Sequence, residues 1–499
     1  MFARPGVFFS TVFLLTFLQI QLFLKTLCFE PGHVFLYLWI LAFSFLALNI
    51  SILAAQAIFR LFVKAPDFPK VEASQIVSLP VALLYCVRNE GFGLKERIRF
   101  TLQGNLLQNL SFWVLSDSDV RYGEAEEKIV RELREEFGEE KIFYRRRPIP
   151  EERKQGNIKE WLVEYGPRYK YFVVCDADSL LPEGWVEEAL RIAEHPHHTR
   201  IGIFQSAIYV AHDASLYSRM LALGQFYAQR LYFHVNQAVL GRSISFGHNC
   251  LIRREAYEKI TLPRGILSHD NWETALLEKE GYQTVFLSEL VSFEEAPPHD
   301  LEEKRRSKRW LRGTLQGWPL LFLPRISFST RFHIFYQIYL YGVQPVLFFW
   351  CLSGLIASPA FRNGMFASER NALFLSTLTL LVLFGHKFTA AGNLADAKRI
   401  LRETLFSTLL GLQNVFYGTL NFLLLSFEEF GWIPMVKNPI DRPTLLECFR
   451  GLLLGTLVGV LGLWVGFHRS SAWTFFALPV LASLIFSIPA VYRTSKAEG

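Results

Sequence analysis

The stretch Val173-Val174-Cys175-Asp176-Ala177-Asp178-Ser179 joins an apolar run to two carboxylates that stand two residues apart. A short apolar run bounded by polar residues predicts a buried strand, which places both carboxylates at its carboxyl end. In open α/β sheets, ligands bind beyond the carboxyl ends of the strands. Carboxylates at such a place can hold Mg²⁺ or Mn²⁺, which shares its coordination with phosphate oxygens. A turn on the protein surface is the alternative for two isolated acids.

The neighbouring sequence alternates short apolar runs with charged, helix-like segments such as Glu124–Phe137 and Glu183–Glu194. This alternation is typical of an α/β domain with a mainly parallel sheet. The expected strands are Val81–Val87, Phe112–Ser116, Tyr171–Cys175, Ile201–Phe204 and Thr284–Leu287.

Polar side chains follow two of these strands. Asn89 and Glu90 come after the first strand, and Ser116-Asp117-Ser118 ends the second. These groups could bind the base and the ribose of a nucleotide through hydrogen bonds. Helix capping and Asx turns are the alternative, because Asn, Asp and Ser favour both.

Two later segments carry groups suited to proton transfer and to phosphate binding. Asp270, before the helical Thr274–Lys279, could be a general base for an attacking hydroxyl, or simply an acid at a helix N-terminus. The run Arg305-Arg306-Ser307-Lys308-Arg309-Trp310 offers paired donors for a diphosphate and an apolar face for a sugar ring. The same run could instead attract anionic lipid, because an apolar run follows it from Phe332.

Charged residues are absent from two long runs near the start of the chain. Gly6–Leu24 contains no ionisable residue, and Pro31–Phe59 contains only His33. Each run reaches the roughly 20 residues that a helix needs to cross the hydrocarbon layer. Arg4 before the first run and Arg60 after the second place both outer ends in the cytosol, by the positive-inside rule.

Five apolar runs follow the expected α/β domain. The third carries Gln413, Asn414 and Asn421 and ends in two glutamates, so we expect an interfacial helix there. Four spans would then follow the domain, giving about six in total and a cytosolic position for both termini. The runs are Phe332–Phe361, Asn371–Ala391, Thr404–Phe427, Gly451–Phe467 and Ser470–Tyr492.

These patterns divide the 499 residues into three parts. Residues 1–63 would form two transmembrane helices, residues 64–331 a cytosolic domain with interfacial helices, and residues 332–499 a membrane region with a cytosolic loop at about 428–448. A content of 51% apolar residues excludes a disordered chain, and a net charge of +6 is too small to indicate nucleic acid as a partner. The six cysteines show no paired spacing, which favours buried free thiols.

The order of the acidic and basic motifs is similar to that of a known family. Asp117, Asp176-x-Asp178, Asp270 and Arg306-x-x-Arg309-Trp310 resemble the D, DxD, D, (Q/R)xxRW signature of processive family 2 glycosyltransferases, such as cellulose, chitin and hyaluronan synthases. Further motifs resemble the glucosyltransferases that make osmoregulated periplasmic glucans, or membrane-derived oligosaccharides, in Gram-negative inner membranes. These motifs are Tyr144-Arg145-Arg146-Arg147, Lys154-Gln155-Gly156-Asn157, Gly247-His248-Asn249, Ser268-His269-Asp270, Glu294-Glu295-Ala296-Pro297-Pro298 and Arg309-Trp310-Leu311-Arg312-Gly313.

The resemblance implies a GT-A-type, Rossmann-like domain inserted between transmembrane helices, and a role for each matching residue. Asp270 would be the catalytic base, and Asp176 and Asp178 would hold Mg²⁺ or Mn²⁺. The residues that would bind the donor, UDP-glucose, are Asn89, Glu90, Asp117, Lys154, Asn157, Asp176, Arg306 and Arg309. The residues that would bind the acceptor are His248, Asn249, His269 and Trp310. Residues 428–448 would stand in the place of a gating loop, although they lack its usual FxVT pattern.

The implied enzyme is an inverting, processive hexosyltransferase that polymerises glucose into a β-glucan, by resemblance β-1,2-linked, and extrudes it across the inner membrane. A periplasmic glucan-processing protein would be a candidate partner beside the lipid bilayer. The alternatives of similar chemistry are a non-processive membrane glycosyltransferase acting on a lipid carrier and another polysaccharide synthase of the cellulose synthase type. A transporter with a regulatory domain is the alternative from another class, which the scarcity of ionisable residues in the spans disfavours.

Overall fold

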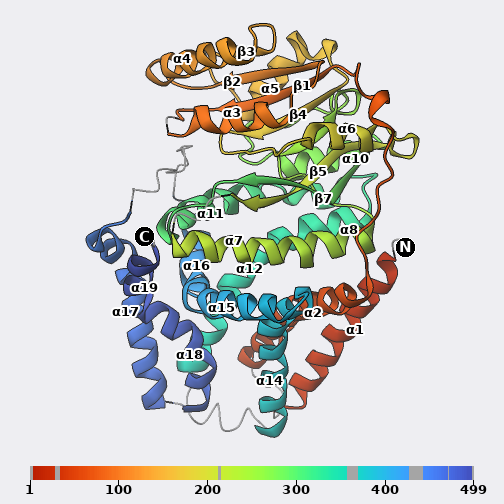
Figure 1. The fold of residues 1–499 in the computed structure, drawn as a ribbon. Coiled ribbons are helices and arrows are strands. Elements are labelled where there is room, and N and C mark those ends of the chain that lie inside the picture. The colour runs from red at the N-terminus through yellow and green to blue at the C-terminus, as the bar shows by residue number, and fades with distance from the viewer. Residues whose placement is uncertain are drawn as a thin grey trace.

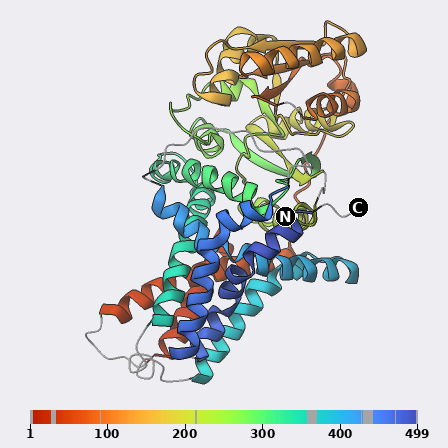
Figure 2. The ribbon, with the colours of Figure 1, turned by 90° about the vertical axis from the view of Figure 1, so that its left-hand side faces the viewer.

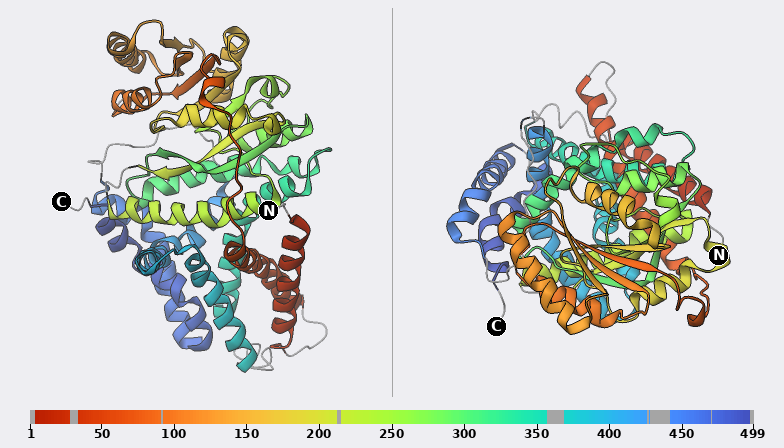
Figure 3. Two further views of the ribbon diagram at one scale, coloured as in Figure 1. Left: turned by 45° about the vertical axis from the view of Figure 1, so that its right-hand side comes forward. Right: turned by 90° about the horizontal axis from the view of Figure 1, so that it is seen from above.

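The computed structural model describes residues 4–27, 34–90, 92–211, 215–356, 369–425, 427, 442–469 and 471–496. A domain built on one β-sheet lies at one end of the molecule, and a bundle of apolar helices lies at the other (Figure 1). Helices that run across the direction of the bundle separate these two parts (Figures 1 and 2). Seen along the long axis of the molecule, the sheet domain lies over the bundle (Figure 3).

The sheet of the described residues has seven strands in the order β3-β2-β1-β4-β6-β5-β7. Strands β1 to β4 pair in parallel, β6 runs antiparallel to both β4 and β5, and β5 pairs in parallel with β7. The prediction of a mainly parallel sheet is therefore confirmed. The strands are β1 (Val81–Val87), β2 (Leu110–Ser116), β3 (Ile142–Arg146), β4 (Tyr171–Asp176), β5 (Ile201–Val210), β6 (Cys250–Arg253) and β7 (Gln283–Glu294).

Both faces of the sheet are covered by helices, which is why its central strands are apolar throughout. Because neighbouring residues of a strand point to opposite faces, Tyr85 and Tyr171 enter one hydrophobic cluster, whereas Leu84 and Phe172 enter another. The first cluster includes residues of α3 (Leu94–Gly104), α4 (Val120–Phe137) and α6 (Trp185–Ala193). The second includes residues of α5 (Arg153–Glu164), α9 (Arg254–Tyr257) and α10 (Asp270–Lys279).

The register of the central strands brings their carboxyl ends together. Val87 of β1 pairs with Ser116 of β2, and Cys86 of β1 pairs with Asp176 of β4. Parallel strands that pair in this way end at the same edge of the sheet, so the loops that follow β1, β2 and β4 are neighbours. The edge that the sequence predicted as a ligand site is formed by these loops.

A layer of helices lies between the sheet domain and the bundle. The helix α7 continues through a π-helical turn, η4, into α8, and this rod runs across the direction of α14 and α17 (Figure 1). The elements of this layer are α7 (Leu216–Ala228), η4 (Gln229–Phe233), α8 (His234–Leu240), α11 (Asp300–Leu315), α15 (Leu394–Gly411) and α16 (Asn414–Leu424). Short 3₁₀ helices complete the connections: η1 (Ala73–Gln75), η2 (Gly166–Arg168), η3 (Pro196–His198), η5 (Trp318–Phe322) and η6 (His386–Ala390).

By length and composition, four described helices could cross a membrane, or five if a pair bent by 62° counts as one span. The four are α1 (Pro5–Leu24), α2 (Val34–Phe62), α12 (Phe328–Ile356) and α17 (Leu445–Arg469), and the bent pair is α18 (Ser471–Ile485) with α19 (Ser487–Thr494). The helix α14 (Glu369–Gly385) is apolar but shorter. The total of six spans and the cytosolic position of the termini stay predictions.

The segment Thr404–Phe427, predicted to lie at the interface, divides into α15 and α16, and neither is among the candidate spans. Most of the predicted loop at 428–448 lies outside the described residues, which resume at residue 442. The helix α17 begins at Leu445, close to the end predicted for that loop, and α12 begins at Phe328, close to the boundary predicted at residue 331.

Glycines let α17 pack closely against its neighbours. A Cβ at Gly459 would lie 2.8 Å from Leu484 Cβ and 3.1 Å from the backbone nitrogen of Ile485. A Cβ at Gly455 would likewise overlap the ring of Tyr417. Small residues at four-residue spacing are a common way for membrane helices to approach, because lipid leaves van der Waals packing as a main source of helix association.

We expect Gly459→Ala to destabilise the protein by about 1–3 kcal/mol, because the added methyl group meets backbone that cannot rotate away. The measurement is the thermal unfolding midpoint of the purified full-length protein. The matched control is Gly385→Ala in α14, where a Cβ would meet no atom within 4 Å. Equal midpoints for the two variants would show that α17 and α18 are not held by this contact.

Candidate active site

Asp117 follows β2 and is held by two side chains from different elements. Arg147 donates from Nε to Oδ1 and from Nη2 to Oδ2 of Asp117, each at 2.8 Å, and Asn157 Nδ2 donates to Oδ1 at 2.7 Å. Arg147 also donates to Glu160 Oε1 at 2.7 Å. Two parallel bonds from a guanidinium fix the plane of a carboxylate. The predicted site residues Asp117 and Asn157 thus form one buried unit at the end of the sheet.

Asn89 joins the loops that follow β1 and β2. Its φ of 55° is a left-handed conformation, which Asn adopts more readily than most residues. Its Nδ2 donates to Asp119 Oδ2 at 3.0 Å, and its Oδ1 accepts the backbone N–H of Asp119 at 2.9 Å. The adjacent Glu90 is buried. The two loops are therefore fixed relative to each other, with Asn89 and Glu90 beside the Asp117 unit.

Asp176 ends β4 and lies between two cationic side chains. Lys154 donates to Asp176 Oδ1 and, at 2.7 Å, to the carbonyl of Gly247. His248 lies with Nδ1 3.8 Å from Asp176 Oδ2 and with Nε2 2.9 Å from Glu294 Oε2. Burial by itself would raise the pKa of Asp176, but Lys154 and His248 lower it well below its usual range. Burial would lower the pKa of His248, but Asp176 and Glu294 raise it to about 9.

Asp270 begins α10 and belongs to the same group of side chains. Ser268 Oγ donates to Asp270 Oδ2 at 3.1 Å, and His269 Nδ1 lies 2.9 Å from Oδ1. Gly247, with φ of 75°, lies so close that a Cβ there would overlap Asp270 Oδ1. Lys154, which donates to Asp176, also donates a hydrogen bond to the carbonyl oxygen of Gly247. Gly247 therefore lies between Asp270 and the lysine that is bonded to Asp176. Burial would raise the pKa of Asp270, but His269 and Lys154 lower it, so the carboxylate is ionised at neutral pH.

The helix α11 turns its cations toward the carboxylates that end β4. Arg306 lies over the ring of Trp310, 4.4 Å from its centroid, and pairs with Glu303 at 2.8 Å. Burial lowers the pKa of Arg309, and the charges of Asp176 and Asp178 oppose that shift, so its guanidinium is within electrostatic reach of both. Trp310 is 44% exposed and can therefore present its ring to a ligand.

Asn249, predicted to contact the acceptor, lies inside the sheet domain next to His248. It is buried with φ of 50°, and its Nδ2 donates to the Phe293 carbonyl at 3.2 Å. Its backbone N–H donates to the Val174 carbonyl at 2.6 Å. The residue thus connects β4 and β7 next to His248, and its contact with an acceptor stays a prediction.

Sequence reasoning missed two buried charged residues that support these loops. Arg97 of α3 donates from Nε to the carbonyl of Ala177, between the two aspartates, at 2.8 Å, and from Nη1 to Glu295 Oε1 at 3.0 Å. Glu126 of α4 accepts hydrogen bonds from two serine hydroxyls at the end of β2. Both lie in charged helices, where nothing in the sequence separates them from exposed neighbours.

The carboxylates that end β4 fit a divalent cation that shares its ligands with a diphosphate. Within the described ranges, no group of three or more His, Cys, Asp or Glu side chains could hold a metal by itself. Mg²⁺ commonly takes only one or two carboxylates and completes its shell with water and substrate phosphates. Asp176 and Asp178 supply that number of carboxylates, and the side chain of Asp176 is 40% exposed.

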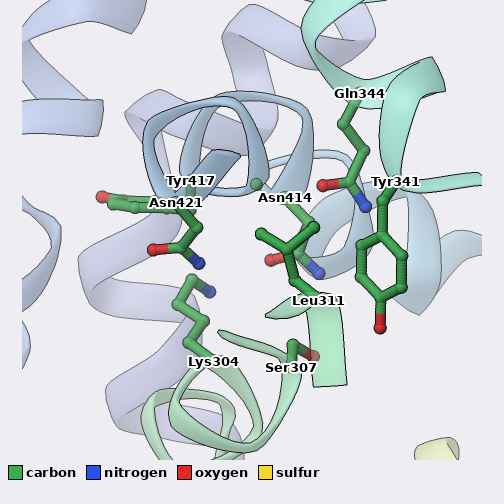
Figure 4. Close-up of a pocket in the computed structure, with 9 residues that line it drawn as sticks. Lys304, Ser307, Leu311, Tyr341, Gln344, Asn414, Tyr417 and Asn421 are labelled. Carbon is green, nitrogen blue, oxygen red and sulfur yellow. The ribbon is translucent and has the colours of Figure 1, made fainter. Parts of the chain in front are cut away.

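A polar pocket lies on the side of α11 that faces the helical bundle (Figure 4). It is a partly open cavity of about 60 Å³ between α11, α12 and α16. Amide and hydroxyl groups are unusual between apolar helices, where each polar group needs a partner. The residues that line it are Lys304, Ser307, Leu311, Tyr341, Gln344, Asn414, Tyr417, Gly418 and Asn421.

Residues 171–390 match the family model described as glycosyl transferase family group 2. The chain is 27% identical over 450 residues to the glucans biosynthesis glucosyltransferase H of Xanthomonas campestris pv. campestris, covering 81% of this chain and 69% of the relative. It is 28% identical over 454 residues to the protein of that name from Pseudomonas aeruginosa, covering 81% of this chain and 52% of the relative. The resemblance that the sequence motifs indicated is therefore confirmed.

A solved structure supports the fold. A mannosyltransferase from Pyrobaculum calidifontis, determined in complex with GDP-Man and Mn²⁺, matches with a TM-score of 0.50 and 15% identity. The match covers 74% of this chain and 99% of that protein. The GT-A-like fold expected from the sequence is therefore shown, together with the apolar helices that accompany it.

We expect Arg147→Gln to destabilise the protein by about 3–5 kcal/mol, because it leaves the buried Asp117 carboxylate without its cation. The measurement is again the thermal midpoint. The matched control is Arg99→Gln, which removes an exposed partner of Glu136 and should change stability by about 1 kcal/mol or less. Similar losses in the two variants would contradict a special structural role for the Asp117 unit.

The raised pKa of His248 predicts a pH-dependent contribution to stability. Because the folded-state pKa of about 9 exceeds the unfolded value of about 6.5, the stabilisation is complete below pH 6.5 and disappears as the pH rises through 9. Its full size is of the order of 3 kcal/mol. The difference in thermal midpoint between wild type and His248→Gln should therefore shrink between pH 7 and pH 10. A constant difference would mean that His248 is neutral in the folded protein.

Proposed function

We propose, from its homology to the glucans biosynthesis glucosyltransferases and its glycosyl transferase family group 2 domain, that this protein polymerises glucose from UDP-glucose into a β-glucan. The observation that carries the proposal is that Asp176, Lys154 and Asp270 form one cluster at Gly247, near the cations of α11. Lys154 donates to both Asp176 and the Gly247 carbonyl, and Gly247 lies against Asp270. A diphosphate, its metal and an attacking hydroxyl each find a matching group in this one cluster.

The donor would occupy the edge of the sheet at the ends of β1, β2 and β4. Asn89, Glu90 and the Asp117 unit would receive the uridine part, since their carboxylate and amide groups suit the donors of a base and a ribose. Asp176 and Asp178 would hold Mg²⁺ or Mn²⁺ together with the diphosphate. The cation would offset the charge that develops on the departing UDP.

Asp270 would act as the general base. Its carboxylate is ionised, and Ser268 and His269 fix its orientation at the start of α10. An acceptor hydroxyl would attack the anomeric carbon from the face opposite the diphosphate while Asp270 takes the proton. The configuration at that carbon inverts, and the reaction needs no covalent intermediate with the enzyme.

The helix α11 would serve donor and acceptor at once. Arg306 and Arg309 would neutralise the diphosphate, and Lys154 would add a third cation. The exposed ring of Trp310 would stack against the acceptor sugar, and His248 and His269 would contact the acceptor beside the carboxylates. The end of a growing chain would then lie next to the helix whose other side lines the polar pocket.

The polar pocket would receive the glucan on its way into the membrane. A hydrophilic chain cannot cross lipid unless its hydroxyl groups find partners, and the pocket supplies amides, hydroxyls and aromatic rings. The proposal therefore includes processive synthesis and extrusion through an inner membrane, with the sheet domain on the cytosolic side. Transfer of a single sugar to a lipid carrier is the outcome that would contradict it.

We expect purified protein, labelled UDP-glucose and Mg²⁺ to give a polymer whose linkage analysis shows β-1,2 bonds. Asp270→Asn should lower this synthesis by about 10²- to 10⁴-fold, which is the usual range for loss of a general base. Binding of UDP, measured by titration calorimetry, should stay within about threefold, because Asp270 is not needed to hold the donor.

The matched control is Glu280→Gln, which removes an exposed acid at the other end of α10. Its polymer synthesis should equal that of the wild type. Full turnover in Asp270→Asn would remove Asp270 from the mechanism, and a short lipid-linked product in the wild type would replace polymerisation by a lipid-carrier reaction.

A further inference from the structure

Basic residues without acidic partners among the described residues gather where the end of α2 packs against η4 and α8. Arg60 is in the last turn of α2, Arg230 is in the π-helical turn η4, and His234 begins α8. The helix α2 contacts both η4 and α8. The three residues come from segments about 170 positions apart, as their numbers show, and the fold brings their charges together.

No described carboxylate forms an ion pair with Arg60 or Arg230. Arg230 instead lies over the ring of Phe226, 4.3 Å from its centroid. Burial lowers the pKa of His234 to about 4, and the two arginines, which are the charged groups that act on it, add to this shift. By contrast, the arginines of the active site, such as Arg97 and Arg147, are paired with acids. The group is thus left with a positive charge that described residues do not neutralise.

Buried donors at this place also lack an acceptor. Arg60 Nε, Gln56 Nε2 and His234 Nε2 are inaccessible to solvent and have no hydrogen-bond partner in the protein. Gln56 is 2% exposed and lies one helical turn before Arg60, so the two side chains are on the same face of α2. Buried donors are nearly always satisfied, because an unmet one is costly. Cationic and unmet donors together indicate an anionic ligand with several acceptor oxygens.

The position along α2 identifies the source of that ligand. Arg60 is at the end of a candidate span, and its neighbours Leu61 and Phe62 are 64% and 71% exposed. Apolar side chains that remain exposed at the end of a span face the acyl chains of lipid. A guanidinium at that level meets phospholipid headgroups, and basic residues there attract anionic lipid.

We propose that Gln56, Arg60, Arg230 and His234 form a binding site for the headgroup phosphate of an anionic phospholipid. Arg60 and Arg230 supply the charge, while Gln56 and His234 supply neutral donors from the buried side. The site adjoins the active site through η4, because Phe233 packs on Phe246 with ring centroids 4.6 Å apart, and Phe246 directly precedes Gly247. A bound lipid would therefore stabilise the position of the rod formed by α7, η4 and α8, against which the loop of Gly247 packs.

The test uses the purified full-length protein and phosphatidylglycerol, with phosphatidylcholine as the neutral probe, and counts retained lipids by native mass spectrometry. The wild type should keep phosphatidylglycerol under detergent conditions that strip phosphatidylcholine. The double variant Arg60→Gln/Arg230→Gln should bind it about thirtyfold more weakly, at roughly fivefold for each basic residue. Unchanged retention in the double variant would overturn the proposal.

Two controls keep the result interpretable. Arg399→Gln/Arg402→Gln removes the same charge from α15 and should keep the wild-type affinity, whereas an equal loss there would mean that only net charge matters and would overturn a specific site. Arg230→Gln alone, at an exposed position, should fold normally and still weaken retention. Inorganic phosphate is the third probe: displacement of the lipid by millimolar phosphate would assign the site to a free anion instead.

Discussion

The absence of a side chain at Gly247 is the constraint on which the candidate active site depends. Its backbone adopts a left-handed conformation, and its carbonyl oxygen accepts a hydrogen bond from Lys154. It lies so close to Asp270 that it leaves no room for a Cβ. Any Cβ would push Asp270 and His269 away from the end of β4. Asp176 and Asp270, about ninety residues apart in the sequence, can share one site because the residue between them, Gly247, has no side chain.

The charges around that glycine stabilise one another, which explains how so many partly buried charges can lie close together. Asp176 lies between Lys154 and His248, His248 lies between Asp176 and Glu294, and Asp270 is paired with His269. Removing one member would leave its neighbour as an uncompensated charge, which is far more costly than the pair itself. The same logic holds at Asp117, where the buried Arg147 pairs with the carboxylate.

Local patterns predicted the strands that carry the chemistry, but not the contacts between them. The apolar run Val81–Val87 became β1 without change, because a strand buried on both faces has a continuous apolar signature. β3 and β6 were missed, since β3 is rich in arginine and β6 is only four residues long. The roles of Arg97 and Arg147 depend on partners distant in sequence, which periodicity cannot show. The rod of α7, η4 and α8 escaped notice because its mixed composition gives neither a span nor a strand pattern.

The helix α11 lies between the sheet domain and the bundle of apolar helices and contributes side chains to a site on each side. On one side its Arg306 and Arg309 lie within electrostatic range of Asp178, and on the other its Ser307 and Leu311 line the pocket between apolar helices. Residues three or four positions apart on a helix share a face, so a single rigid element would fix the spacing between the proposed donor site and the pocket. In the proposed reaction, a sugar added at Trp310 would need no long transfer before it meets polar groups. Elongation and passage into the membrane would then depend on one helix rather than on a separate moving part.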